Sequence, residues 1–312
     1  MESTELLAAT DQCLAKAADY IRAGQLVAFP TETVYGLGAD ATSDDAVARV
    51  FEAKARPTFN PLIVHVASLD EAENFAHFNQ AARMLGKVFW PGPLTLVLPI
   101  RSDARVSKLA LAGADTIALR VPRAPIAQKL LLAVGRPIAA PSANPSGKIS
   151  PTSAAHVLRG LAGRIAAIVD GGACPVGLES TVISTGVPPA LLRQGGLAQA
   201  EIERVLGVPL ALPDDADGAA SPGRDLSHYA PDAALRMNAT EARNNEVLLG
   251  FGAIDGTENL SPDGDLTQAA ANLFRLLHVL NGLGRPIAVA PVPEEGLGLA
   301  INDRLRRASG QR

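Results

Sequence analysis

Cysteine is scarce in this sequence, and its scarcity restricts the class of protein. The 312 residues include two cysteines, Cys13 and Cys174, which lie far apart and form no C-x-x-C pair. A disulfide framework is therefore excluded, and we expect both thiols to be reduced and buried in a cytoplasmic protein. Five scattered histidines supply none of the spacings typical of zinc ligands, so no built-in metal site is expected.

Two further absences concern partners. The chain has no excess of basic residues, because 28 lysines and arginines stand against 32 acidic residues and give a net charge of −4. Only a local basic patch could therefore serve to bind nucleic acid. The longest charge-free runs are short: residues 88–100 number 13, fewer than the about 18 that a membrane-spanning helix needs. The acidic start of the chain is unlike a signal peptide, and we expect no membrane contact.

The sequence does have the composition of a folded α/β protein. Hydrophobic residues make up 47% and charged residues 19% of the chain, which excludes disorder. Thr4 and Gly24 are placed to begin and end a first helix. Apolar runs typical of buried strands then alternate with segments of helical periodicity. We expect strands at 26–29, 62–66, 94–98, 116–121, 137–139, 165–169 and 181–184, and helices at 4–22, 43–54, 81–89, 126–134 and 153–161.

One segment interrupts this alternation. Residues 209–232 contain four prolines, two glycines and five aspartates, a composition typical of a linker. The length of 312 residues also suggests two domains. We therefore predict a domain with a mixed sheet at 1–208, a linker at 209–232 and a smaller α/β domain at 233–312. The expected elements of the smaller domain are strands at 247–251 and 287–290 and helices at 266–280 and 299–307.

The common nucleotide-binding and hydrolase motifs are missing. No G-x-x-x-x-G-K-[ST], complete G-x-G-x-x-G or G-x-S-x-G occurs in the chain. Any chemistry must therefore come from less generic segments rich in small polar residues, glycine and proline. Four such segments stand out: Pro30-Thr31-Glu32-Thr33-Val34-Tyr35-Gly36-Leu37-Gly38, residues 54–62 with the nearby His65, residues 141–150, and Gly177-Leu178-Glu179-Ser180-Thr181-Val182 with Arg193 downstream.

Taken singly, each segment has an ordinary structural explanation beside a functional one. The first could be a plain loop after a strand, or a place where the backbone approaches a ligand. Lys54 and Arg56 could stabilise a helix C-terminus, or hold phosphate oxygens. His65 could be a core histidine. The serine-rich third segment could be a capped turn, or an anion-binding loop.

Together and in this order, the segments resemble the threonylcarbamoyl-AMP synthase family, the YrdC-like enzymes. The resemblance covers residues 14–207. It is carried by Lys54-x-Arg56-Pro57, Trp90-Pro91-Gly92-Pro93-Leu94-Thr95, Pro141-Ser142-Ala143-Asn144 and Leu178-Glu179-Ser180-Thr181. The remainder resembles the long form of the family, with Ser221-Pro222-Gly223, His228-Tyr229-Ala230-Pro231, Gly296-Leu297-Gly298 and Ile301-Asn302-Asp303-Arg304. The stretch 224–227 departs from the more basic, aromatic run usual in the family.

The resemblance implies a fold, an activity and partners. The fold would be a YrdC-like twisted mixed sheet with flanking helices, joined by an extended linker to a small Rossmann-like domain. The activity would form threonylcarbamoyl-AMP and pyrophosphate from L-threonine, bicarbonate or CO₂, and ATP, with Mg²⁺ arriving with the nucleotide. The product would pass to proteins that transfer the threonylcarbamoyl group to tRNA, while the chain itself would contact tRNA weakly at most.

The resemblance also implies site residues. The threonine site would be lined by Thr33, His65, Arg120, Ala140 and Ser180. ATP would be held by Arg56, Asn60, Thr116, Ser142, Ser150, Arg193 and Tyr229. Lys54 and Arg56 would offset phosphate charge in catalysis, and the linker would lie across the nucleotide as a lid, with Tyr229 over it. Two other functions compete with this one: a double-stranded RNA or tRNA-binding module on the same fold, and another carbamoyl-transfer enzyme.

Overall fold

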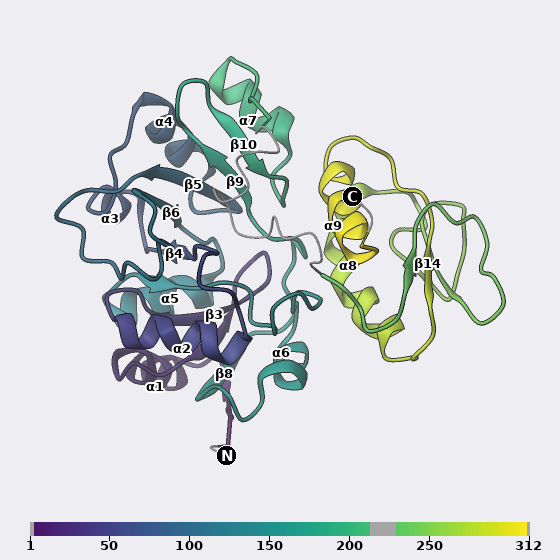
Figure 1. Cartoon of the computed structure of the whole chain (residues 1–312), viewed down its shortest axis with the longest axis horizontal. Helices are drawn as coiled ribbons and strands as arrows, with labels where there is room; N and C mark the ends of the chain where they lie inside the picture. The colour runs from purple at the N-terminus through teal and green to yellow at the C-terminus, as the bar shows by residue number, and fades with distance from the viewer. Residues whose placement is uncertain (1–2, 213–228, 311–312) are drawn as a thin grey trace.

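The computed structural model describes residues 3–212 and 229–310, and two β-sheets organise them (Figure 1). The first sheet is built from β1 (Glu5–Ala8), β2 (Val27–Pro30), β3 (Tyr35–Asp40), β4 (Ile63–His65), β5 (Leu94–Pro99), β6 (Thr116–Arg120), β7 (Ile138–Ala139), β8 (Ala167–Asp170), β9 (Thr181–Ser184) and β10 (Ala190–Arg193). Its helices are α1 (Asp11–Arg22), α2 (Asp44–Lys54), α3 (Leu69–Ala72), α4 (Gln80–Phe89), α5 (Pro125–Val134), α6 (Ala154–Leu161) and α7 (Gln199–Leu206).

This ten-stranded sheet is mixed, as expected. Its strand order is β1-β8-β2-β3-β7-β4-β6-β5-β9-β10. The pairs β4–β6 and β5–β9 are parallel, whereas β5–β6 and β9–β10 are antiparallel. Because β4, β6 and β9 come from distant parts of the chain, the topology gathers residues of different sequence segments along the middle of one sheet.

Helices cover both faces of the first sheet. On one face, α1 and α5 pack on alternate residues of the strands, for example Val27 and Phe29 of β2. On the other face, α2, α4, α6 and α7 cover the intervening side chains, of which Ala28 is one. Two-sided burial explains why these strands appear in the sequence as continuous apolar runs.

The expected helix at 4–22 is wrong in its first part. Residues 5–8 form β1, an edge strand parallel to β8, and the helix begins later, at α1. Its N-cap is Thr10, whose side chain accepts a hydrogen bond from the backbone N–H of Cys13. Thr4 instead donates its hydroxyl to the carbonyl oxygen of Ile165, 2.7 Å away.

The glycine-rich segment at 35–38 is a strand rather than a loop. β3 pairs antiparallel with β2 and places Gly38 directly opposite Val27. A Cβ atom on Gly38 would lie 2.8 Å from the ring of Phe29, so the close packing of this hairpin requires glycine. The chain reverses direction at Thr31–Val34, and the polar residues of the first segment are thereby held in a tight hairpin loop.

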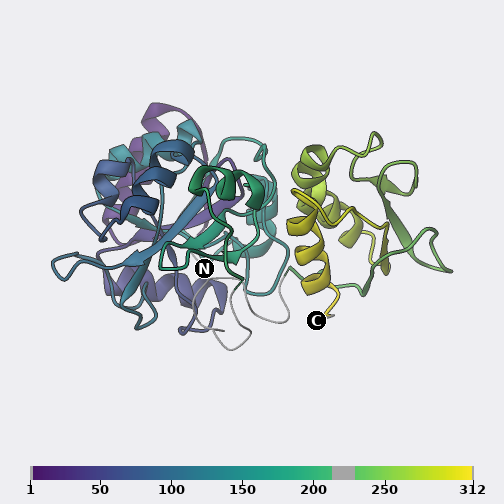
Figure 2. The same cartoon turned by 90° about the horizontal axis from the view of Figure 1, so that it is seen from above.

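The second sheet belongs to a smaller parallel α/β unit. It contains β11 (Leu235–Arg236), β12 (Val247–Gly250), β13 (Glu258–Asn259) and β14 (Ile287–Val289), in the order β11-β14-β12-β13, with α8 (Leu266–Asn281) and α9 (Gly298–Ala308). In both views α8 and α9 lie between this sheet and the first unit (Figures 1 and 2).

The two units share one apolar core. Val34, Ile149 and Leu178 of the first unit pack into the cluster that contains the buried face of α8. Gly177 approaches α8 so closely that a Cβ atom would lie 2.5 Å from the carbonyl oxygen of Ala270. Its positive φ of 72° also favours glycine. The interface is therefore tightly packed and positions α9 beside the first sheet.

The predicted linker falls partly outside the described residues. Residues 213–228, including His228 of the expected lid, lie in that gap. Its last part is described: Ala230 donates its backbone N–H to the carbonyl oxygen of Gly147, 2.8 Å away. Among the described residues, no helix has the length and apolarity required to cross a membrane.

Candidate active site

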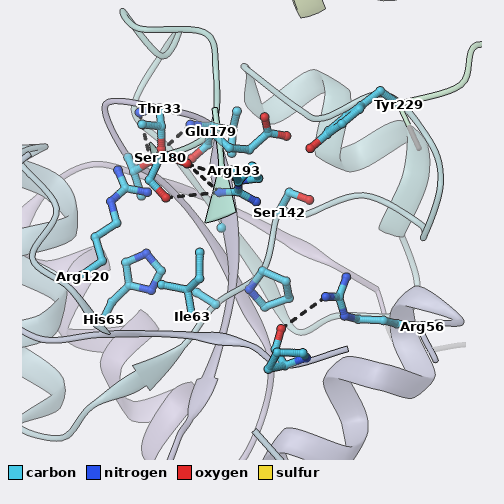
Figure 3. Close-up of a pocket in the computed structure, with 16 residues that line it drawn as sticks. Thr33, Arg56, Ile63, His65, Arg120, Ser142, Glu179, Ser180, Arg193 and Tyr229 are labelled. Atoms are coloured by element: carbon cyan, nitrogen blue, oxygen red, sulfur yellow. Dashed lines mark hydrogen bonds between the residues drawn. The ribbon is translucent and has the colours of Figure 1, made fainter. Parts of the chain in front are cut away.

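A pocket opens where the central strands of the first sheet meet the second unit (Figure 3). The β2–β3 hairpin, the ends of β4 and β6, the segment after β7, the start of β9 and the end of β10 all contribute to it. It is lined by Thr31, Thr33, Val34, Gly36, Arg56, Pro61, Ile63, His65, Arg120, Ala140, Pro141, Ser142, Glu179, Ser180, Arg193 and Tyr229. Nine of the thirteen residues that the sequence assigns to the site are in this group.

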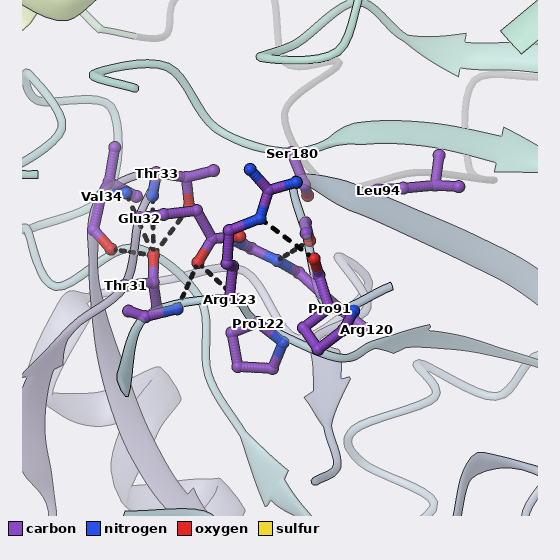
Figure 4. Close-up of polar contacts among 12 residues, drawn as sticks. Thr31, Glu32, Thr33, Val34, Pro91, Leu94, Arg120, Pro122, Arg123 and Ser180 are labelled. Atoms are coloured by element: carbon purple, nitrogen blue, oxygen red, sulfur yellow. Dashed lines mark hydrogen bonds and ion pairs between the residues drawn. The ribbon is translucent and has the colours of Figure 1, made fainter. Parts of the chain in front are cut away.

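At one end of the pocket, Arg120 is fixed by a buried carboxylate (Figure 4). Its Nη2 lies 2.7 Å from Oε1 of Glu32, and both side chains are about 5% exposed. The other oxygen, Oε2, accepts hydrogen bonds from the backbone N–H groups of Arg123 and Ala124, at 2.9 and 3.2 Å. Burial alone would raise the pKa of Glu32, but Arg120 and these hydrogen bonds lower it, so the carboxylate is charged.

His65 lies beside Arg120, because β4 and β6 pair in the register that sets the two residues opposite each other. The imidazole is buried, and among the described residues its Nδ1 atom has no hydrogen-bond partner. Burial and then the Arg120 charge lower the pKa of His65 to about 3. A neutral imidazole with an available ring nitrogen therefore faces this end of the pocket.

Hydroxyl groups line the wall above Arg120 and His65. The hydroxyls of Thr33 and Thr31 are 2.7 Å apart, and those of Ser180 and Thr95 are also 2.7 Å apart. Arg193 donates from Nη2 to the carbonyl oxygen of Ser180 at 2.8 Å. These residues come from four separate places in the sequence, and the sheet brings them to one wall.

At the other end of the pocket, Arg56 and Ser142 face Tyr229 (Figure 3). The Arg56 guanidinium donates to the carbonyl oxygens of Asn60 and Pro61, at 3.4 and 3.3 Å, which directs it along the pocket mouth. Tyr229 is 1% exposed and stacks on Phe274 of α8, with ring centroids 5.4 Å apart. The linker residue is thus held by the second unit.

Glu179 also belongs to this end, and its partners come from both units. Its Oε1 accepts a hydrogen bond from the Ser150 hydroxyl at 2.6 Å, and its Oε2 accepts one from Nε of Arg304, on α9, at 3.1 Å. Burial would raise the pKa of Glu179, but Arg304 and then Arg193 lower it to about 2. The carboxylate is therefore ionised in the wall of the pocket.

Four predicted residues lie outside the lining. Lys54 is buried and donates to the carbonyl oxygens of Ser142, at 2.5 Å, and Asn144, so it holds the loop that carries Ser142. Burial and the nearby Arg56 lower the pKa of Lys54 well below its ordinary value. Ser150 lies behind Glu179, and Asn60 presents its carbonyl to Arg56. Thr116 begins β6, at the end of the strand opposite to Arg120.

Sequence reasoning does not assign Glu32, Glu179 or Arg304 to the site, although the structure places Glu179 in the pocket lining and the other two in contact with lining residues. Each of the three lies in one of the motifs quoted from the sequence, but no local signal shows which distant charge each one meets. The assembled pocket presents a cation at one end and further cations, Arg56 and Arg193, towards the other. Such an arrangement suits a pair of ligands that carry a carboxylate and phosphates. Within the described chain, no three His, Cys, Asp or Glu side chains gather as a metal site.

The two α/β units and the charged pocket are typical of an enzyme that binds small anionic substrates. Comparison with known proteins identifies the family. A family model described as "Telomere recombination" matches residues 19–195, and one described as "Threonylcarbamoyl-AMP synthase, C-terminal domain" matches residues 197–310. The threonylcarbamoyl-AMP synthase of Pyrococcus abyssi is 46% identical over 95% of this chain and 94% of its own length. That of Bacillus subtilis is 41% identical over 100% of this chain and 97% of its own.

A solved structure agrees with these relatives. The crystal structure of P. abyssi Sua5 complexed with L-threonine superposes with a TM-score of 0.92 at 43% identity, covering 99% of this chain and 98% of the other. The chain belongs to the threonylcarbamoyl-AMP synthase family. The expectations for family, fold class and an adenylate-forming enzyme are thereby confirmed.

Proposed function

We propose that this pocket forms threonylcarbamoyl-AMP and pyrophosphate from L-threonine, bicarbonate or CO₂, and ATP, with threonine at the Arg120 end and the nucleotide at the Tyr229 end. The observation that carries the proposal is the arrangement of charges along one pocket. Arg120, fixed by Glu32, is a preorganised partner for a small carboxylate, whereas Arg56 and Arg193 lie towards the end that a polyphosphate could enter.

Threonine fits the first end in size and chemistry. Its carboxylate would pair with Arg120, and the hydroxyl of Thr33 or Ser180 would accept from its ammonium or donate to it after deprotonation. The neutral imidazole of His65 can accept from the threonine hydroxyl through Nδ1, which satisfies a buried atom that otherwise lacks a partner. Ala140 leaves room for the methyl group. A relative with 43% identity has been crystallised with L-threonine, which supports this assignment.

ATP would occupy the second end. Arg56, Ser142 and Arg193 line the pocket there, Ser150 supports it through Glu179, and the Tyr229 ring covers it. Lys54 would act through the Ser142 loop, which its ammonium group fixes, and Asn60 would act by directing Arg56. Thr116 begins β6, at the end of the strand opposite to Arg120, and its contact with ATP stays a prediction.

The chemistry requires positioning and charge more than a protein nucleophile. The free amine of threonine attacks CO₂ and releases one proton to solvent, which gives a carbamate. A carbamate oxygen then attacks the α-phosphorus of ATP, and the bond to pyrophosphate breaks in line. The guanidinium groups of Arg56 and Arg193 would offset the charge that develops on the leaving pyrophosphate. Mg²⁺ would enter with the nucleotide and share that task.

The wider assignments are proposals of the same kind. The product would pass to proteins that transfer the threonylcarbamoyl group to tRNA, and this reaction would take place in the cytoplasm. Residues 1–208 would form the catalytic domain and residues 233–312 the smaller domain, with the linker 209–232 between them. Tyr229 would close the nucleotide end from that linker.

The test is pyrophosphate release by the purified full-length chain. We expect release that requires L-threonine, bicarbonate and ATP together, with an adenylate product of the mass of threonylcarbamoyl-AMP. Parallel assays with serine and glycine test the contribution of the threonine methyl group. We expect kcat/KM for threonine to exceed that for serine by roughly ten- to two-hundred-fold. Salt-sensitive binding of double-stranded RNA without any turnover would instead favour the rival binding function.

A further inference from the structure

Arg304 belongs to the second unit, lies outside the pocket lining and is nevertheless fully buried against the pocket wall. Its guanidinium uses all three nitrogens. Nε donates to Glu179 at 3.1 Å, Nη2 to the carbonyl oxygen of Gln194 at 2.8 Å, and Nη1 to Asp303 at 2.7 Å. The same group lies 5.1 Å from the centroid of the Tyr229 ring. One side chain of α9 thus contacts two pocket-lining residues.

Glu179 is the reason that this contact matters. It places a negative charge in the wall of the end assigned to a polyphosphate. The charged or polar groups that face it are Arg304 from α9, Arg193 from β10, the Ser150 hydroxyl and the Tyr229 ring, with Asp303 behind Arg304. Arg193 also donates to the backbone and hydroxyl of Ser180. Arg304 is therefore the main compensation for the Glu179 charge.

Holding the two units together does not by itself explain a buried arginine. The interface already has an apolar core in which Ile149 and Leu178 pack on α8, and Gly177 allows close backbone approach. At such a place a hydrophobic side chain of similar volume is often as stabilising as a buried ion pair, or more so. The charge of Arg304 therefore points to a role in the pocket.

We propose that Arg304 is a positioning residue for ATP: the second unit inserts its guanidinium behind Glu179, neutralises that carboxylate, and fixes it where it holds the Ser150 hydroxyl. The nucleotide end is then electrostatically complete only when α9 is docked. This inference rests on the proposed function, because it assumes that Glu179 and Ser150 border the triphosphate.

The first experiment is steady-state kinetics of full-length Arg304→Met with threonine and bicarbonate saturating. We expect KM for ATP to rise by roughly ten- to a hundred-fold, the scale of one charge-assisted interaction, while kcat and KM for threonine change by less than about three-fold. Arg304→Lys should fall in between. The matched control is Arg306→Met on the exposed side of the same helix, where Arg306 pairs with Glu294, and it should leave all constants unchanged.

Two further measurements separate positioning from a merely structural role. In Arg304→Met, burial raises the pKa of the unpaired Glu179, so its charge appears as pH rises. We therefore expect KM for ATP in this variant to increase as pH rises, whereas in the native enzyme Arg304 and Arg193 keep Glu179 ionised and no such dependence is expected. Glu179→Gln removes the charge, and KM for ATP in the double variant should lie within about three-fold of Glu179→Gln alone.

The outcomes are distinguishable. A folded Arg304→Met that loses thermal stability but keeps the native KM for ATP and its pH profile would show a structural role only. A double variant no better than Arg304→Met would show that Arg304 does not act through Glu179. If Arg304→Met does not fold, the comparison of Glu179→Gln with the double variant decides, and a further ten-fold rise in KM for ATP overturns the proposal. Absence of synthase activity in the native chain would refute the proposed function instead.

Discussion

The pocket contains two buried carboxylate–guanidinium pairs, and they are built in opposite senses. In the Glu32–Arg120 pair the arginine lines the pocket and the glutamate stands behind it. In the Glu179–Arg304 pair the glutamate lines the pocket and the arginine stands behind it. The first pair thus presents the Arg120 cation to the pocket. The second presents the Glu179 carboxylate, whose charge is balanced by Arg304 and which accepts a hydrogen bond from the Ser150 hydroxyl.

The two pairs also differ in where their partners come from. Glu32 and Arg120 both belong to the first sheet and its loops, so the end proposed for threonine can form within one unit. Glu179 belongs to the first unit and Arg304 to the second, so this pair, at the end proposed for the nucleotide, needs both units. In either case the loss of one partner leaves a buried charge, which typically costs about 3–5 kcal/mol. Substitutions at the two ends should therefore affect different substrates.

The largest expected effect is at the ligand-facing cation of the first pair. Arg120→Met removes the partner of the threonine carboxylate and leaves Glu32 charged beside it. We expect kcat/KM for threonine to fall by about a hundred-fold or more, with KM for ATP within about three-fold of native. The neighbouring Arg123→Met, whose side chain is exposed, is the control and should change neither constant. A native KM for threonine in folded Arg120→Met would contradict the assignment of the two ends.

The next effect belongs to the nucleotide end. Arg56→Ala removes a forked donor directed along the pocket mouth, and kcat/KM for ATP should fall by roughly ten- to a hundred-fold. Threonine binding, measured by its protection of the protein against thermal unfolding, should persist. Arg49→Ala on the exposed side of α2 is the matched control, since Arg49 donates only to the Gly24 carbonyl among the contacts described. Near-native use of ATP by Arg56→Ala would remove Arg56 from the site.

Amide substitutions compare the two carboxylates directly. Both oxygens of Glu32 accept from fixed donors, namely Arg120 and two backbone N–H groups, so the amide group of Glu32→Gln must face one of them. We expect KM for threonine to rise about ten-fold. One oxygen of Glu179 faces the Ser150 hydroxyl, which can turn and accept from an amide. Glu179→Gln should therefore change KM for ATP by less than about three-fold. If Glu179→Gln raised KM for ATP as much as Glu32→Gln raises KM for threonine, the two carboxylates would have the same role in their pairs, and the contrast drawn between the pairs would be wrong.

The smallest effect concerns stability against pH. The pKa of His65 is lowered to about 3 in the folded state, so the unfolded state binds more protons as pH falls below about 6.5 and stability is lost. His156 and His278, whose pKa values are lowered to about 3 and about 4, act in the same direction. The pKa of Glu179, lowered to about 2, contributes stability above about pH 4.5 that is lost below it.

Thermal unfolding followed between about pH 7 and about pH 3 should therefore show two ranges of acid sensitivity. Near pH 5 the lowered pKa of His65 alone costs about 2 kcal/mol of the free energy of unfolding. His65→Gln should reduce the loss of stability in the upper range and leave the lower range unchanged. An upper range that is unaffected by His65→Gln would mean that this imidazole is protonated in the folded protein.

Many strands and helices could be predicted because the burial of an element determines which residue types appear in its own short stretch of sequence. The run at 94–98 is mostly apolar because both faces of its strand are covered, and Ser43 forms the N-cap of α2. β1 escaped prediction because only one of its four residues is buried and its partner β8 follows about 160 residues later. β3 escaped because glycine is usually depleted in strands, whereas here Phe29 demands it.

The site was predictable as a set of segments but not as a set of contacts. Spacing marks residues 30–38 and 177–182 as loops of small polar side chains, and the family resemblance adds Arg56 and Arg120, which lie outside both segments. Nothing near Glu32 in the sequence specifies Arg120, which follows 88 residues later. Lys54 illustrates the reverse case: a cation that a motif assigns to phosphate is directed here at two carbonyl oxygens, because the Ser142 loop closes over it.

The span between Glu179 and Arg304 has a consequence for biosynthesis. The two residues are 125 positions apart, and the arginine is made second. At a translation rate of about 5–20 residues per second, roughly 6–25 seconds separate them on the ribosome. During that interval a nascent first unit can pair Glu32 with Arg120 but has no partner for Glu179 from α9. The amino-acid end of the catalyst would thus mature before its nucleotide end, and a newly made chain would gain affinity for ATP only after its last helix docks.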